Sequence, residues 1–136
     1  MQLASGLDTL RLSLHVLAAS VWVGGQVVMM GLVPTARSLS DETAAVKLAR
    51  AFARVSWPAF WILVITGFWN MSALHGETAH GAWNTVMGVK LIVVALAGLG
   101  AFLHGRAKGA AGKAAWGSIA GVASIAALVL GVLLAG

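Results

Sequence analysis

The sequence predicts an all-α polytopic membrane protein, a bundle of four transmembrane helices that forms a single domain over residues 1–136. Of its 136 residues, 60% are hydrophobic and only 10% are charged, whereas a soluble domain has about 25% charged residues. The apolar residues also gather in four stretches, each long enough for a helix to cross about 30 Å of hydrocarbon. These spans cover residues 10–34, 55–74, 84–104 and 114–135.

The first span is expected to continue a helix that starts outside the membrane and runs to Pro34. Ser5, with Asp8 three residues later, forms a capping-box pattern that would start this helix near Gly6. The second helix is expected to open at Ser40-Asp41-Glu42, where a cap and two acids suit the positive end of a helix dipole.

Residues near the third span and in the fourth span indicate contacts with the membrane surface and with other helices. Trp69 and Trp83 flank the loop before the third span as an interfacial aromatic belt. The fourth span carries Gly117-x-x-x-Gly121, a spacing of small residues that lets membrane helices approach closely. This face predicts a homodimer or attachment to a larger membrane complex.

The charges set the expected topology. The net charge is +5, but the basic residues lie at the ends of the spans rather than in a patch for nucleic acid, so the expected surroundings are a lipid bilayer. Lys and Arg exceed acids in the connections after the first and third spans, which marks the cytoplasmic side. We therefore expect a multi-pass protein of the inner (cytoplasmic) membrane with both termini outside. Cysteine is absent, which excludes disulfides and thiolate metal sites.

Two ionisable residues inside the spans are the strongest functional signal. His15 lies in the first span and Lys90 in the third, and an ionisable group at membrane depth suggests a functional site by default. Each lies about nine residues into its helix, so their depths should be similar. Trp22 and Gln26 share the helix face of His15, and Met87 shares that of Lys90.

Several chemistries fit these residues. A neutral imidazole in a helix bundle is a good axial ligand for haem iron, and Lys90 could be the second ligand, a propionate partner or a proton carrier. Copper is an alternative, because thioethers and imidazoles suit Cu(I). The weaker candidate ligands for a metal are Met29, Met30, His75, His80 and His104. Two structural roles also stay open. His15 could serve packing alone, and the Lys90 side chain could reach to the membrane–water interface.

Three segments resemble known membrane families. The segment LHVLAASVWVGG (residues 14–25) resembles the first-span signature of the copper-resistance D (CopD) family. AFARVSWPAFWILVITGFWN (residues 51–70) resembles the second span of that family and of the HemJ-type protoporphyrinogen oxidases. MGVKLIVVALAGLGAFLHGR (residues 87–106) resembles the third span of both.

The resemblance implies a four-helix membrane unit. In HemJ-type proteins the first-span histidine is tied to b-type haem and a lysine lies at the same site, which here correspond to His15 and Lys90. CopD-like proteins are associated with moving copper across the inner membrane and have about eight spans when full-length, so a chain with four would need to dimerise for such a path. Gly88 stands where HemJ-type proteins often have a second histidine, a departure from the oxidase pattern.

Our leading interpretation is a CopD/HemJ-like protein that binds a redox-active metal centre, haem b, in an electron-transfer or porphyrin-related role. His15 would be the axial ligand and Lys90 the second ligand or a nearby charge partner, with Trp22, Gln26 and Met87 as lining residues. A haem-dependent oxidoreductase of the protoporphyrinogen-oxidase type is one form of this role. The alternatives are copper binding or transport, and a small accessory subunit of a larger membrane complex.

Overall fold

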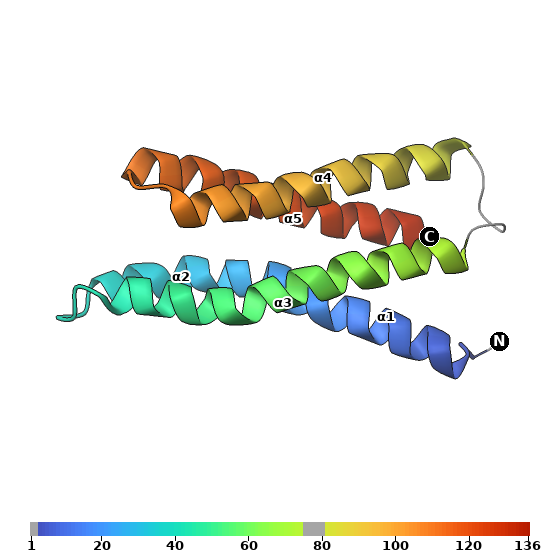
Figure 1. Ribbon diagram of the computed structural model, residues 1–136, viewed down its shortest axis with the longest axis horizontal. Helices are drawn as coiled ribbons and strands as arrows, with labels where there is room; N and C mark the ends of the chain where they lie inside the picture. The colour runs from blue at the N-terminus through green and yellow to red at the C-terminus, as the bar shows by residue number, and fades with distance from the viewer. Residues whose placement is uncertain (1–2, 75–80) are drawn as a thin grey trace. The chain divides into compact units, whose positions relative to one another are not determined.

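The computed structural model describes residues 3–74 and 81–136, and the regular structure in these ranges is entirely helical. Its elements are α1 (Gly6–Ala19), the π-helix η1 (Ser20–Gly24), α2 (Gly25–Arg37), α3 (Ala44–Ala73), α4 (Gly81–Arg106) and α5 (Ala110–Ala135) (Figure 1). The first three join into one continuous helix, Gly6–Arg37. That helix, α3, α4 and α5 are each long and apolar enough to cross a membrane, so the predicted all-α class with four membrane-spanning helices is confirmed.

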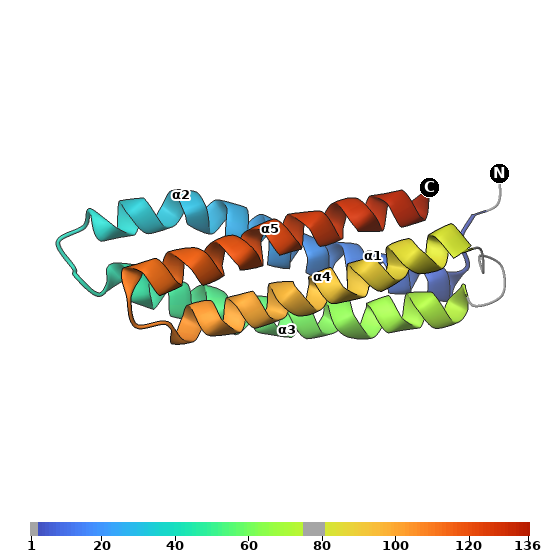
Figure 2. The same ribbon diagram turned by 90° about the horizontal axis from the view of Figure 1, so that it is seen from above.

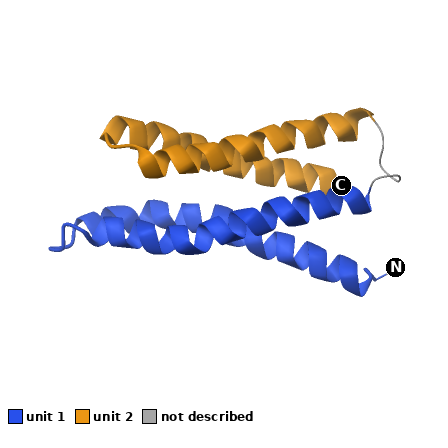
Figure 3. Ribbon diagram, viewed as in Figure 1, with its two compact units in different colours: residues 1–75 blue, residues 76–136 orange. Residues whose placement is uncertain are grey.

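The chain divides into two compact units, Met1–His75 and Gly76–Gly136 (Figure 3). In the first unit the continuous helix α1–η1–α2 packs along α3, and the two run in opposite directions (Figure 1). In the second unit α4 and α5 form an antiparallel hairpin (Figure 2). Each unit is therefore a helical hairpin with its own interhelical contacts.

The start of α1 follows the predicted cap. The Ser5 hydroxyl accepts a hydrogen bond from the Asp8 backbone N–H at 3.2 Å and donates to the Asp8 carboxylate at 2.6 Å. The far end differs from the prediction, because the helix continues through Pro34 to Arg37. A proline removes only its own N–H from the helix, and its carbonyl still accepts from Ser38 N–H at 3.2 Å.

The start of α3 also differs from the prediction. The helix begins at Ala44, and Asp41 rather than Ser40 supplies the side-chain contacts that precede it. The Asp41 carboxylate accepts hydrogen bonds from the Thr43 hydroxyl at 2.6 Å and the Thr43 N–H at 2.9 Å, and it pairs with Lys47 at 3.0 Å. The Thr43 hydroxyl and the Lys47 ammonium hold the pKa of Asp41 below its usual range. The carboxylate therefore stays ionised near the positive end of the α3 dipole.

A π-helical turn interrupts the first membrane helix at Ser20–Gly24, and the sequence pattern did not predict it. A π-turn inserts one extra residue, so it changes the faces that the flanking α-helical segments present, and such turns occur often at functional sites. At the following residue the helices are close, because a Cβ on Gly25 would collide with the ring of Phe52 on α3. Glycine at this position thus permits the contact between α2 and α3.

The helices of the α4–α5 hairpin approach closely at Gly100. A Cβ at this position would lie 2.9 Å from the backbone nitrogen of Ala120 and 3.2 Å from its Cα. At Gly117 the neighbour is a side chain of the same unit, because a Cβ there would lie 2.9 Å from Nδ1 of His104. A Cβ on Gly121 would meet nothing within 4 Å. The small residues of this hairpin therefore serve its own packing at Gly100 and Gly117.

The helix surfaces are apolar. Large side chains such as Leu17, Ile65 and Val122 are 63%, 64% and 69% exposed. Surfaces of this kind are stable against lipid tails and costly in water. The chain is therefore a multi-pass membrane protein.

Candidate functional site

His15 lies in contact with α3 in the first unit. Its Nδ1 is 2.8 Å from the Thr66 hydroxyl oxygen, and Thr66 is itself only 3% exposed. A Cβ on Gly67 would lie 3.6 Å from Cε1 of the imidazole, so a glycine stands beside the ring. The face of α1 that carries His15 is thus an interhelical face.

The hydrogen bonds of Thr66 define the tautomer of His15. The Thr66 hydroxyl donates to the Ile62 carbonyl oxygen at 2.6 Å, so its one proton is already used. Towards His15 the hydroxyl oxygen must then accept, which places the imidazole proton on Nδ1. In this tautomer the ring lone pair lies on Nε2. A histidine whose Nδ1–H is held by a hydrogen bond while Nε2 carries the lone pair is the arrangement common among metal-ligating histidines.

An aromatic cluster lies further along the same hairpin, around the π-helical turn. Trp22 is 4% exposed, with its ring centroid 4.7 Å from that of Phe60 and 5.6 Å from that of Trp57. Trp61 extends the cluster at 5.7 Å from Phe60. Trp22 follows His15 by seven residues, or two helical turns. The predicted lining residue Trp22 therefore packs on the same helix, α3, that holds His15.

Gln26 bonds within its own helix. Its side-chain amide donates to the Trp22 carbonyl oxygen at 3.1 Å, a carbonyl inside the π-helical turn. π-turns leave backbone carbonyls poorly matched to the usual i→i−4 donors, so this amide partly satisfies the irregular backbone. The structure thus assigns Gln26 a backbone contact near Trp22.

Arg11, which no sequence motif marked as a site residue, is buried near the start of α1. It is 7% exposed, and its Nη2 lies 3.0 Å from the Asp8 carboxylate. The signal that would have found it is its spacing: it precedes His15 by four residues and so shares its helix face.

Lys90 belongs to the second unit, where it lies against α5. A Cβ on Gly131 would be 3.1 Å from the Lys90 ammonium nitrogen and 3.7 Å from its Cε. The glycine therefore leaves the space that the end of the lysine side chain occupies. Met87 lies on the same helix, α4, three residues before Lys90. The role of Lys90 as a second ligand stays a prediction.

The weaker metal candidates lie on α2, on α4 or outside the described residues. Met29 and Met30 are on α2, fourteen and fifteen residues beyond His15, or about 21 Å or more of helix, too far to reach an ion on its imidazole. His104 is engaged in the second unit, where its Nδ1 donates to the Lys113 carbonyl oxygen at 2.7 Å. His75 and His80 fall outside the described residues.

Within residues 3–74 and 81–136, no three histidine or carboxylate side chains come together as a group that could hold a metal ion. A haem iron does not need such a group, since the porphyrin supplies the equatorial ligands and the protein only an axial one. Comparisons of this chain with known protein families, curated proteins and solved structures found no match. Function must therefore be inferred from the residues themselves.

Proposed function

We propose that this protein is a membrane haem b protein of the CopD/HemJ-like superfamily, with an electron-transfer or porphyrin-related role and with His15 as an axial ligand. The observation that carries the proposal is the hydrogen bond of 2.8 Å between His15 Nδ1 and Thr66. With the imidazole proton on Nδ1, this contact supports a tautomer whose lone pair is on Nε2, the nitrogen that would ligate haem iron. The three sequence segments that resemble those families support the superfamily.

Residues along this hairpin support the proposal. Gly67 leaves only a hydrogen beside the imidazole, and Trp22 and Phe60, further along the hairpin, are aromatic and buried. A porphyrin needs an apolar slot with small residues near the ligand, and this hairpin supplies both kinds of residue. When bound, haem would supply a one-electron redox couple. The residues of the chain would hold its iron on Nε2, orient the imidazole through Thr66 and exclude water.

The direct test is the absorption spectrum of the detergent-purified protein, made with ample haem, in the oxidised and dithionite-reduced states. We expect a Soret band that shifts on reduction. A featureless visible spectrum would contradict the proposal. In that case bound copper in a metal analysis would favour the copper alternative, and co-purified subunits with neither signal would favour an accessory role. We also propose that the protein lies in the inner membrane with both termini outside. The excess of Lys and Arg in the connections after the first and third spans supports this orientation.

The contact between His15 and Thr66 gives a second prediction, which concerns haem affinity. Thr66→Val keeps the shape of the side chain but removes the oxygen that accepts from His15 Nδ1–H. Loss of such an outer contact costs about 10- to 100-fold in the affinity of a metal site, so we expect haem titration to show a fall of that size. Thr66→Ser is the matched control, because it keeps the hydroxyl and should bind within a few-fold of the wild type. Equal affinities of the valine and serine variants would contradict the role of Thr66.

A further inference from the structure

An open groove lies in the first unit between the continuous helix α1–η1–α2 and α3. Its volume is about 400 Å³, within the range of about 300–1,000 Å³ for small-molecule sites. Every residue that lines it is apolar or glycine, and both helices contribute, among them Val21, Val28 and Leu32 on one wall and Leu48, Phe52 and Val55 on the other. The groove is therefore large enough for an apolar chain and offers no polar side chain within it.

The groove runs along the helices. Its wall on α3 extends from Leu48 to Val55, about 10 Å of helix, and its other wall from Val21 to Leu32, about 16 Å. One leaflet of a bilayer has about 15 Å of hydrocarbon, half of the 30 Å core. Val28 and Val55 are each 58% exposed, so the first unit itself leaves the groove open. The length and direction of the groove thus fit a lipid acyl chain.

Basic side chains lie beside the groove on α3. Lys47, Arg50 and Arg54 recur at three- and four-residue steps, so they share one face of the helix, and Arg54 directly precedes Val55 of the groove wall. Both arginines are exposed. Long side chains on a helix lean toward its N-terminus, which for α3 is the end nearest Leu48. The guanidinium groups are therefore expected near the Leu48 end of the groove.

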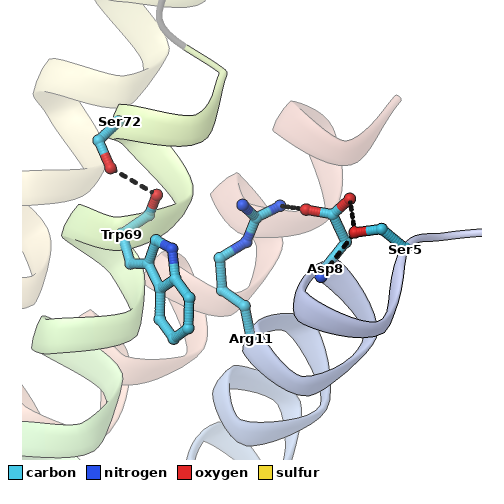
Figure 4. Close-up of polar contacts among 5 residues, drawn as sticks. All are labelled: Ser5, Asp8, Arg11, Trp69 and Ser72. Carbon is cyan, nitrogen blue, oxygen red and sulfur yellow. Dashed lines mark hydrogen bonds and ion pairs between the residues drawn. The ribbon is translucent and has the colours of Figure 1, made fainter.

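Both arginines of this basic face lack a carboxylate partner within residues 3–74. The ion pairs of the first unit involve other residues, because Asp8 pairs with Arg11 at 3.0 Å near the start of α1 (Figure 4), and Asp41 pairs with Lys47 at 3.0 Å. An apolar groove with two unpaired positive charges beside one end suits a ligand that has an apolar chain and an anionic head.

We propose that this groove binds an acyl chain of an anionic phospholipid from the surrounding bilayer, and that Arg50 and Arg54 hold the phosphate of the lipid. A guanidinium matches a phosphate in two-point geometry, and basic side chains beside membrane helices attract anionic lipids. The site is separate from the proposed haem site, because Gly25 in its lining lies ten residues beyond His15, about 15 Å of helix. The lipid site neither depends on the haem proposal nor fails with it.

The test compares dioleoyl phosphatidylglycerol, which is anionic, with dioleoyl phosphatidylcholine, which has the same acyl chains and no net charge. Each lipid is titrated into the delipidated full chain in detergent, and native mass spectrometry gives the dissociation constant of the first bound lipid. One basic residue changes the affinity for an anionic lipid by about 5-fold, so the two arginines should give about a 25-fold preference for phosphatidylglycerol.

Two double variants test the charges. In the protein with both Arg50→Gln and Arg54→Gln, the preference for phosphatidylglycerol should fall to within about twofold. The matched control carries Lys108→Gln and Lys113→Gln, which remove two exposed positive charges at the connection between α4 and α5. This control should keep the full preference, because its charges lie in the other unit.

Two tryptophan variants test the groove itself. Ala51→Trp adds an indole to the groove wall and should weaken the binding of phosphatidylglycerol by about 5-fold or more, because the acyl chain and the indole compete for the same space. Ala49→Trp is the matched control, since it adds the same side chain to an exposed position of α3 outside the groove lining. It should bind the lipid as the wild type does.

Each contrary outcome overturns the proposal. Equal affinities of the wild type for the two lipids would do so, as would an unchanged preference in the double arginine variant. An equal loss of preference in the double lysine variant would show that the net charge of the protein, not this site, attracts the lipid. If Ala51→Trp binds phosphatidylglycerol as tightly as Ala49→Trp, no lipid chain occupies the groove, and a protein surface would then be its occupant. The wild-type comparison needs no variant, so a poorly folded variant does not remove the test.

Discussion

The His15→Ala protein is expected to bind no haem b, whereas the His104→Ala protein is expected to bind it as the wild type does. His15 is the histidine on an interhelical face of the first unit, with its Nδ1 2.8 Å from the Thr66 hydroxyl oxygen. The Nδ1 of His104 donates to the Lys113 carbonyl oxygen at the other hairpin. Loss of an outer contact already costs about 10- to 100-fold in metal affinity, so loss of the ligand itself should cost more than that. The Soret band should fall to baseline in His15→Ala.

A chemical rescue separates ligand loss from misfolding. His15→Gly leaves a space for free imidazole, and a folded hairpin with an intact haem slot should regain the Soret band when imidazole is added. Full binding by His15→Ala would disprove axial ligation by this residue. A protein that loses the band and is not rescued, while its helical circular dichroism is unchanged, would assign His15 a role in closing the site rather than in ligation.

The four helices were predictable because membrane insertion depends on a local property. About 20 consecutive apolar residues are enough to cross the bilayer as a helix, whatever they pack against. The interior face at His15 was also predictable, since side chains repeat at three and four residues along a helix. What the sequence did not predict is the partner of that face, because the register between two helices is set by their packing. Thr66 was an inconspicuous residue within the apolar stretch of the second span.

The π-helical turn and the burial of Arg11 were missed for different reasons. A π-turn adds one residue without changing composition, and the adjacent Gly24-Gly25 pair was its only local sign. Arg11 lies before the centre of the apolar stretch, where an arginine is expected at the membrane surface with its charge in water. Its burial follows from the packing of α1 on α3, which periodicity alone does not give. The charged residue one helical turn from the proposed ligand was thus one that the expected topology places on the outer side.

The Gly100→Ala protein is expected to unfold more readily than the wild type by about 1–3 kcal/mol, the usual cost of overpacking. The added methyl group would lie 2.9 Å from the Ala120 nitrogen and 3.2 Å from its Cα. Both are backbone atoms, so no side chain can turn away, and α4 and α5 would have to separate. Membrane helices associate through close packing rather than through a hydrophobic driving force. Separation therefore removes the main attraction within this hairpin.

Gly88→Ala is the matched control for that substitution. It adds the same methyl group to the same helix at a position where a Cβ meets nothing within 4 Å. Its effect on stability should be close to zero or slightly favourable, because alanine forms helices better than glycine. Reversible unfolding in mixed micelles with increasing sodium dodecyl sulfate measures both free energies on one scale. If the two variants unfold at the same detergent fraction, the contact at Gly100 does not hold the hairpin together. The stability of the hairpin must then come from the remaining contacts between α4 and α5.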